Sequence, residues 1–302
     1  MIPVHNCADY LAETLPEVVA QLADRDDAEI IVVDDASRDD PGRVVVRLGR
    51  DRVQYRPNPE HLGAIGTFNR CLDLATGELV HLLHGDDMVL PGFYAAMEQA
   101  LADPTTIAAV CRVQDVDAHG SPTYITRSYR KGTGVWRDAL DAFAVSNRVR
   151  APGIVVRRAA YEVVGGFRTD LPHAADWEMW TRLAAHGQIM FVDRVLACYR
   201  RHDTSDTSAR VRTGTNIRER VTAIGVVGGH VPPNRRARTR RRALAYSVEF
   251  ATRTALSLVR TGKWSAAGRQ GREAVRCAWL LLRGAPVSPH SAEVGNSVPI
   301  AD

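Results

Sequence analysis

The sequence predicts an α/β fold with a mostly parallel sheet flanked by helices, followed by a basic helical extension. Over residues 1–209, short apolar runs alternate with longer amphipathic segments, which is the pattern of βαβ units. The runs are rich in β-branched residues, as in strands that are buried on both faces of a sheet. A shift from acidic to basic composition near residue 210 predicts where the extension begins.

The expected elements follow from hydrophobic periodicity and from the residues that bound each run. An amphipathic spacing of apolar residues indicates a helix, whereas a short apolar run that ends in polar residues indicates a buried strand. On this basis we predict strands at 1–4, 29–33, 53–56, 79–83 and 107–113, and helices at 9–23, 64–76, 92–102, 235–261 and 264–282. We expect residues 285–302 to be disordered.

Charge is distributed unevenly along the chain. Residues 1–209 carry 22 Lys and Arg against 30 Asp and Glu, whereas residues 210–284 carry 17 against 3. No apolar stretch is long enough to cross a bilayer, and the N-terminus lacks the pattern of a signal peptide, so we expect a cytoplasmic protein. The five cysteines lack the spacing of a zinc site.

Two pairs of acids end two of the predicted strands. Asp34 and Asp35 follow the strand at 29–33, and Asp86 and Asp87 follow the strand at 79–83. Parallel strands present the same end to the same side of a sheet, so we expect the two pairs to converge on one crevice. Neighbouring carboxylates repel each other unless a cation lies between them, and oxygen ligands favour Mg²⁺ or Mn²⁺.

Seven motifs, in order, resemble family 2 glycosyltransferases of the GT-A fold. They are Pro3-Val4-His5-Asn6, Val32-Val33-Asp34-Asp35-Ala36-Ser37, Asn58 to Asn69 with Gly63 and Gly66, Gly77-Glu78 through Asp86-Asp87 and Pro91, Gly165-Gly166-Phe167, Ala175-Asp176-Trp177-Glu178-Met179-Trp180, and Tyr199-Arg200-Arg201-His202. The resemblance covers residues 1–209. It implies an inverting, metal-dependent enzyme that moves a sugar from a nucleotide diphosphate to a hydroxyl group of a glycan or lipid-linked acceptor, in cell-envelope or exopolysaccharide synthesis.

The resemblance also implies roles on the donor side of the site. Asp35 would accept a hydrogen bond from the base of a UDP- or dTDP-linked sugar, and Asp86 would bind the metal, with His202 completing the metal's ligands. Asp87 would support the loop or the sugar. The remaining donor-binding residues implied are Pro3, Val4, His5, Gly63 and His84.

On the acceptor side, Asp176 corresponds to the general base, which would take the proton from the acceptor hydroxyl. Trp177 and Trp180 would offer apolar faces to a sugar, although their i, i+3 spacing equally favours helix core. Arg182 is expected to pair with a local acid rather than with phosphate.

Three features depart from the family pattern. His84 stands where the first acid of the Asp-x-Asp motif is usual, and Ala175 replaces the acid that commonly precedes the base. The chain also begins almost at the nucleotide-binding segment, so we expect that coding residues precede Met1. The alternatives to a glycosyltransferase are a nucleotidyltransferase, which would need a Gly-rich phosphate loop that the segment after residue 5 lacks, and an inert sugar-nucleotide or glycan-binding protein.

The predicted extension over 210–284 has two candidate functions. Six arginines lie between Arg235 and Arg242, and an apolar stripe from Leu244 to Leu258 follows them. Such a combination suits the anionic inner face of the plasma membrane, and a solvated helix face is the alternative. No nucleic-acid-binding motif accompanies the charge, so we expect no nucleic-acid partner.

Overall fold

The computed structural model describes residues 1–203 and 205–284, and contacts divide the chain into two compact units. The N-terminal unit comprises residues 1–143 and 147–203, and the C-terminal unit comprises residues 144–146 together with residues 205–284. The change from one unit to the next therefore falls at residue 203, six residues before the predicted position. Residues 285–302, which we expect to be disordered, lie outside the described residues.

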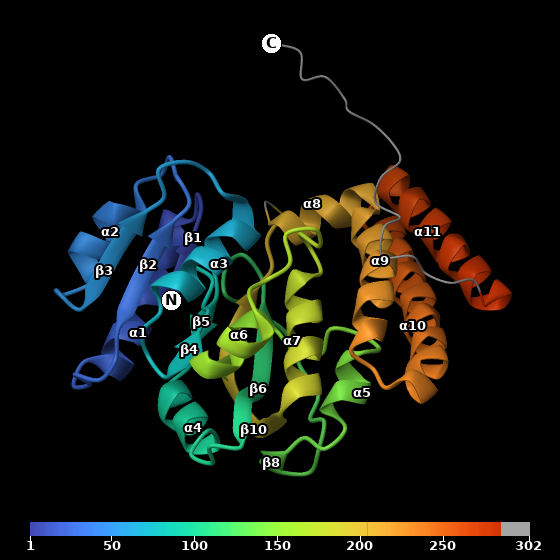
Figure 1. The fold of residues 1–302 in the computed structure, drawn as a ribbon. Coiled ribbons are helices and arrows are strands. Elements are labelled where there is room, and N and C mark those ends of the chain that lie inside the picture. Colours follow the sequence, from blue (N-terminus) through green and yellow to red (C-terminus); the bar gives the residue numbers. More distant parts are fainter. Residues whose placement is uncertain (204, 285–302) are drawn as a thin grey trace. The chain divides into compact units, whose positions relative to one another are not determined.

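The N-terminal unit contains two sheets whose strands lie in the order β1-β2-β3 and β4-β9-β6-β10-β5, with β7 on β6 and β8 on β10 (Figure 1). The strands are β1 Ile2–Val4, β2 Ile30–Asp34, β3 Val53–Pro57, β4 Leu79–His81, β5 Met88–Val89, β6 Thr106–Val116, β7 Pro122–Ile125, β8 Gly134–Val135, β9 Ile154–Arg157 and β10 Gln188–Arg200. The helices are α1 Ala8–Leu22, α2 Pro41–Leu48, α3 Gly63–Leu74, α4 Phe93–Ala100, α5 Ala139–Phe143, α6 Arg158–Val164 and α7 Ala175–His186.

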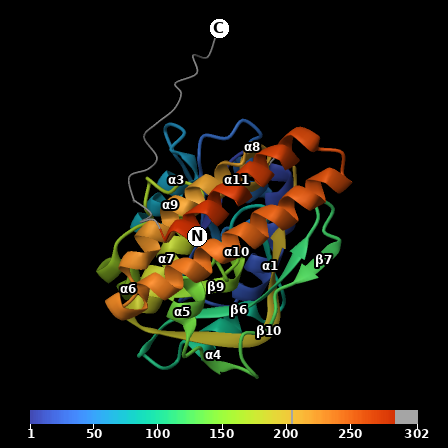
Figure 2. The same cartoon turned by 90° about the vertical axis from the view of Figure 1, so that its right-hand side faces the viewer.

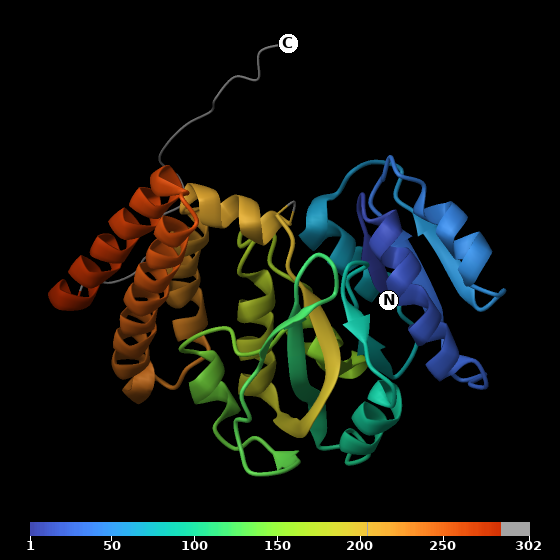
Figure 3. The ribbon, with the colours of Figure 1, turned by 180° about the vertical axis from the view of Figure 1, so that it is seen from behind.

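Strand direction confirms the expected fold class but not the expected proportion of parallel pairs. The strands β1, β2 and β3 are parallel, and β6 and β10 run parallel side by side (Figure 3). All other pairs in the larger sheet are antiparallel among the described residues. The sheet is therefore mixed, because β5, β7, β8 and β9, which the sequence did not predict, each pair antiparallel with a neighbour.

Alternate residues of the central strands face two separate cores. Val32 and Cys111 contact one core, which α1 and α4 cover, whereas Val33 and Val110 contact the other core, which α3 and α7 cover. Burial on both faces explains why the strands are uninterrupted apolar runs.

Backbone hydrogen bonds bring β1 against the chain that follows β4. The amides of Leu83 and Gly85 donate to the carbonyls of Met1 and Pro3 at 3.0 and 3.1 Å. A Cβ on Gly85 would lie 2.6 Å from the Val4 side chain, so only glycine allows this approach. Strand β1 therefore lies between the end of β2, which carries Asp34 and Asp35, and the chain after β4, which carries Asp86 and Asp87.

The C-terminal unit is helical in the part of the chain that the structure describes. Its helices are α8 Asp206–Thr213, α9 Thr215–Gly229, α10 Pro233–Arg260 and α11 Trp264–Arg283. The helices α10 and α11 run side by side (Figure 2), and their shared core includes Ile217, Val221, Ala251 and Cys277. None of the described helices is long and apolar enough to span a bilayer.

Candidate active site

The loop that carries Asp86 and Asp87 lies beside the end of β10. Met88 and Val89 form β5, which pairs with Cys198 and Ala197 of β10. This short antiparallel pairing places the loop before β5 against the residues that follow Cys198. The site therefore joins segments that are more than one hundred residues apart in the sequence.

Asp86 and His202 contact each other directly. The Nε2 atom of His202 lies 2.9 Å from the Oδ2 atom of Asp86. Burial raises the pKa of Asp86, but the His202 hydrogen bond and the nearby His84 outweigh this effect and hold the pKa below its usual value. Asp86 is therefore a carboxylate at neutral pH.

Asp87, the residue after Asp86, is buried. Its Oδ1 atom accepts a hydrogen bond of 2.9 Å from the backbone amide of Arg200, while its buried Oδ2 atom has no hydrogen-bond partner and lies 3.6 Å from His84 Nδ1. Burial and the charge of Asp86 raise the pKa of Asp87 well above its usual value. A buried carboxylate oxygen without a donor indicates a place where a cation would stabilise the site.

His84 completes a group of three possible ligands with the two acids. One ligand atom from each of these three residues lies within 4.8 Å of the others. The imidazole stacks on Phe68 with ring centroids 4.9 Å apart, and burial lowers its pKa, so it is neutral at pH 7. A neutral imidazole can bind a divalent cation or a hydroxyl group.

Arg200 forms hydrogen bonds with the loop that carries Asp86, a role that the sequence did not predict. Its fully buried guanidinium donates to the carbonyls of Asp86 and Ala118 at 3.0 Å each and to Glu13 Oε2 at 2.6 Å. It also lies 4.6 Å from the centroid of the Tyr10 ring. The motif that contains Arg200 is visible in the sequence, but its partners come from three distant segments.

Asp176 lies in the first turn of α7. Its Oδ2 atom accepts 2.7 Å from Asn147 Nδ2, and its Oδ1 atom accepts 2.6 Å from the Trp177 amide. Burial raises the pKa of Asp176 above its usual value even though these bonds and nearby histidines lower it. His84 is among those histidines, which places Asp176 within electrostatic range of the Asp86 loop. Asn147 has no motif around it, so the sequence offered no signal for this contact.

Asp35 is held by the chain's own donors. Its Oδ1 atom accepts from the Leu62 amide at 2.7 Å and from Asn58 at 3.0 Å, and its Oδ2 atom lies 2.9 Å from His61 Nδ1. These contacts hold the pKa of Asp35 below its usual value although burial alone would raise it. His5 Nδ1 lies 2.7 Å from the Asp35 carbonyl, and the His5 and His61 rings are 4.4 Å apart.

Four of the apolar residues predicted to face ligands are buried. Val4 belongs to the core beside α1, so its side chain does not line a nucleotide site. Trp177 and Trp180 are each 2% exposed: the indole of Trp177 donates to the Phe143 carbonyl, and Trp180 meets Phe167 edge-on. This burial fits the alternative that the i, i+3 spacing also favoured, in which both rings belong to the helix core. Pro3 is also buried, whereas Gly63 begins α3 with a φ of +73°.

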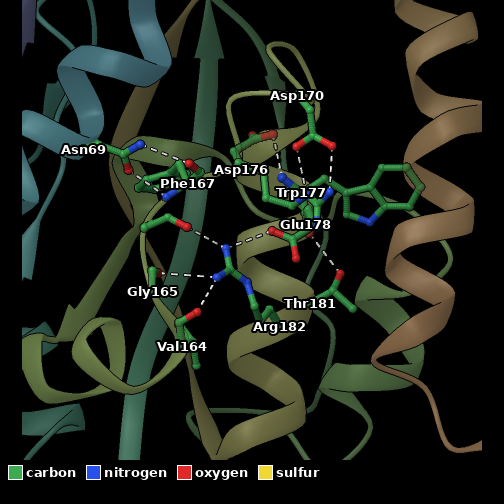
Figure 4. Close-up of polar contacts among 12 residues, drawn as sticks. Asn69, Val164, Gly165, Phe167, Asp170, Asp176, Trp177, Glu178, Thr181 and Arg182 are labelled. Carbon is green, nitrogen blue, oxygen red and sulfur yellow. Dashed lines mark hydrogen bonds and ion pairs between the residues drawn. The ribbon is translucent and has the colours of Figure 1, made fainter. Parts of the chain in front are cut away.

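Arg182 binds a local acid, as predicted. Its guanidinium lies 3.0 Å from Glu178 Oε2 and donates to the carbonyls of Val164 and Gly166 (Figure 4). The Asn69 side chain forms two hydrogen bonds with the backbone of Phe167, which belongs to the same turn. These contacts connect the turn after α6 to the helix that carries Asp176.

The mixed sheet, with acids grouped at its strand ends and an acid at the start of α7, defines a GT-A glycosyltransferase fold. A family model described as "Glycosyl transferase family 2" matches residues 1–160, and the chain belongs to this family. Residues 1–349 of TarS from S. aureus, solved with UDP-GlcNAc, match with a TM-score of 0.64 at 15% identity, over 94% of this chain and 90% of that one. The mannosyltransferase PcManGT from Pyrobaculum calidifontis, solved with GDP-Man and Mn²⁺, has a TM-score of 0.58 at 20% identity over 93% of this chain and 85% of its own.

Relatives in sequence match about two thirds or more of this chain at below 30% identity. An uncharacterised Mycobacterium tuberculosis protein, MT1568, is 28% identical over 230 residues, which are 72% of each chain. The hyaluronan synthase of Pasteurella multocida is 23% identical over 70% of this chain, and the match spans 21% of that enzyme. Other mycobacterial relatives are matched over 57% of their length.

Proposed function

We propose that this protein is an inverting, metal-dependent glycosyltransferase that moves a sugar from a nucleotide diphosphate to a hydroxyl group of a glycan or lipid-linked acceptor. The observation that carries the proposal is the contact of His202 with Asp86, beside the buried and unpartnered oxygen of Asp87. Cell-envelope or exopolysaccharide assembly is the proposed setting, supported by the similarity to the hyaluronan and chondroitin synthases of Pasteurella multocida.

The residues present fit a divalent cation. Asp86 and His202 would bind it, and the orphaned Asp87 oxygen and neutral His84 offer further oxygen and nitrogen ligands, a set that suits Mn²⁺ or Mg²⁺. When bound, the cation would neutralise the diphosphate charge that grows as the bond to the sugar breaks. The Mn²⁺ in the PcManGT structure supports this choice.

On the donor side, Asp35 is the proposed acceptor for the imide N–H of a UDP or dTDP base. His5, with the adjoining Pro3 backbone, would lie beside the base, and Gly63 would let the start of α3 approach the donor. Asp87 would keep the loop in place through the Arg200 amide. The UDP-GlcNAc bound to TarS, which shares the fold, supports a uridine donor.

Asp176 is the proposed general base. The carboxylate would remove the proton from the acceptor hydroxyl as that oxygen attacks the anomeric carbon from the face opposite the nucleotide, so a single displacement inverts the configuration. A pKa raised by burial makes Asp176 a better proton acceptor than a solvated aspartate. The bonds from Asn147 and the Trp177 amide would aim the carboxylate.

Two variants separate metal binding from proton transfer. Titration calorimetry with Mn²⁺ should show UDP and dTDP binding lost in Asp86→Ala but kept in Asp176→Asn, whereas transfer, followed as nucleotide release with a donor panel, should fall about 10²–10⁴-fold in Asp176→Asn. Asp73→Ala removes an exposed acid from α3 and serves as the matched control. Equal donor binding by Asp86→Ala and the wild type would refute the metal assignment.

A further inference from the structure

Helix α11 presents an apolar stripe on the side opposite the core of its own unit. The residues that face the core are Ala266, Ala267, Gln270, Glu273, Ala274 and Cys277. Trp264, Val275, Trp279 and Leu282 are separated by eleven, four and three residues, so at about 100° per residue they fall within about 60° of one another. We call these four residues the α11 stripe.

The α11 stripe is open to solvent in the part of the chain that the structure describes. Its members are 68%, 70%, 48% and 86% exposed in sequence order. Gly268 and Gly271 lie on the same face, and a Cβ at either position would meet nothing within 4 Å. Val275, Trp279 and Leu282 lie on neighbouring turns, and Trp264 lies on the same face about three turns before them. Large apolar side chains gathered on one solvent-facing side of a helix indicate a binding surface rather than scattered exposure.

Positive charge runs along one edge of the α11 stripe. Arg272, Arg276 and Arg283 are exposed there, and the guanidinium of Arg283 lies 4.6 Å from the centroid of the Trp279 ring. Residues 210–284 as a whole have a net charge of +14. The occupant of this surface must therefore accept apolar side chains and carry negative charge.

We propose that the α11 stripe docks on the surface of an anionic bilayer, with the two tryptophans at the level of the headgroups and the arginines on lipid phosphates. Tryptophan and arginine on one helix are the usual composition of a helix that lies in the membrane interface. A second copy of this chain fits less well, because its own arginine row would face the first. The proposal is independent of glycosyl transfer, since vesicle binding needs no nucleotide.

The structure also changes which residues would meet the membrane. The apolar stripe that the sequence indicated on α10 faces the interior of the C-terminal unit: Leu244 is 1% exposed, Ala251 is fully buried, and Val248 packs on the same core. The arginines near Arg235 remain exposed and add to the charge, but α11 supplies the apolar contact.

Tryptophan fluorescence reports on the α11 stripe directly. Of the five tryptophans, Trp136, Trp177 and Trp180 are 2–3% exposed, and the other two belong to the stripe. With the full chain and vesicles of phosphatidylcholine containing 30% phosphatidylglycerol (about the charge of an anionic bilayer), we expect a blue shift and flotation with the vesicles. Pure phosphatidylcholine, or high salt, should weaken both.

Matched variants make the test decisive. Val275→Glu with Leu282→Glu should lower the partition coefficient at least about tenfold, and Gly271→Leu, which adds an apolar side chain to the stripe, should raise it severalfold. Val46→Glu alters a valine of α2 that is 87% exposed, compared with 70% for Val275, and should leave vesicle binding unchanged. Undiminished vesicle binding by the double variant would overturn the proposal. The proposal would also be wrong if the wild-type chain did not bind vesicles but sedimented as a dimer, and the double variant sedimented as a monomer. The partner of the α11 stripe would then be a second copy of this chain.

Discussion

The Nε2 atom of His202 lies 2.9 Å from the Oδ2 atom of Asp86, although 116 positions separate the two residues. The pairing of β5 with β10 makes this contact possible, because it aligns Met88 with Cys198. Asp86 and His202 then lie on the two chain segments just beyond this pair. The carboxylate, the imidazole and the buried Arg200 therefore form one assembly. Disturbing any of the three should affect the other two.

Arg200→Lys tests whether the hydrogen bonds of Arg200 stabilise the loop that carries Asp86. A lysine keeps the charge but cannot donate to Asp86, Ala118 and Glu13 at once, because its ammonium lacks the planar fork of the guanidinium. We expect the free energy of unfolding to fall by about 1–3 kcal/mol and Mn²⁺ affinity to fall with it. Denaturant unfolding and calorimetry measure the two effects, with the exposed Arg201→Lys as control. Unchanged Mn²⁺ affinity in a less stable variant would limit Arg200 to a structural role.

Asn147→Ala tests the environment of the proposed base. The Asn147 amide stabilises the Asp176 carboxylate, so removing it raises the pKa of Asp176 further. A base must be deprotonated, so activity falls as the pH drops through that pKa, and a higher pKa moves the fall to higher pH. We expect the acid limb of kcat/KM to move up by about one pH unit.

The control for this shift is Asn69→Ala, whose amide binds the Phe167 backbone instead. This variant should lower stability without moving the acid limb. An acid limb that stays in place in Asn147→Ala would mean that Asp176 does not set the pH dependence.

Arg182→Ala tests the turn that precedes Asp176. The change removes the ion pair with Glu178, whose side chain is 1% exposed, and the hydrogen bonds to two carbonyls of the turn. Because breaking a buried ion pair leaves a charge without this partner, we expect a loss of about 3–5 kcal/mol in the free energy of unfolding. The matched change Arg168→Ala removes an exposed pair with Asp170 and should cost less than about 1 kcal/mol. Similar losses in the two variants would contradict the arrangement in Figure 4.

His61→Ala tests whether Asp35 receives the donor base. His61 Nδ1 lies 2.9 Å from the Asp35 oxygen that a base would need, so a nucleotide must displace the imidazole before it binds there. Removing the imidazole should increase UDP affinity severalfold in calorimetry, because no contact has to be broken first. His119→Ala, which changes an exposed histidine elsewhere, should leave affinity unaltered. Weaker UDP binding in His61→Ala would show that His61 itself holds the nucleotide.

Local pattern identified about half of the helices and strands that the structure describes, and the missed elements include the long strand β10 as well as very short strands. The strand at Ile30–Asp34 is an uninterrupted β-branched run, and the helix at Ala8–Leu22 repeats its apolar residues over about four turns, so both can be recognised from local sequence. By contrast, β5 and β8 contain two residues each, and β9 could pair in either direction. Such short strands exist because a partner is present, and their own residues carry no period.

The sequence by itself determined the α/β class, the family motifs and the acids at the strand ends, because these depend on local periodicity and on residues adjacent in the chain. Only the tertiary structure decided which groups meet: His202 with Asp86, Asn147 with Asp176, and Arg200 beneath the loop. It also decided that Trp177 and Trp180 belong to the core and that α11, not α10, carries the exposed apolar stripe. Helical spacing shows that residues share a face but not what that face contacts, because burial depends on segments far away in the chain.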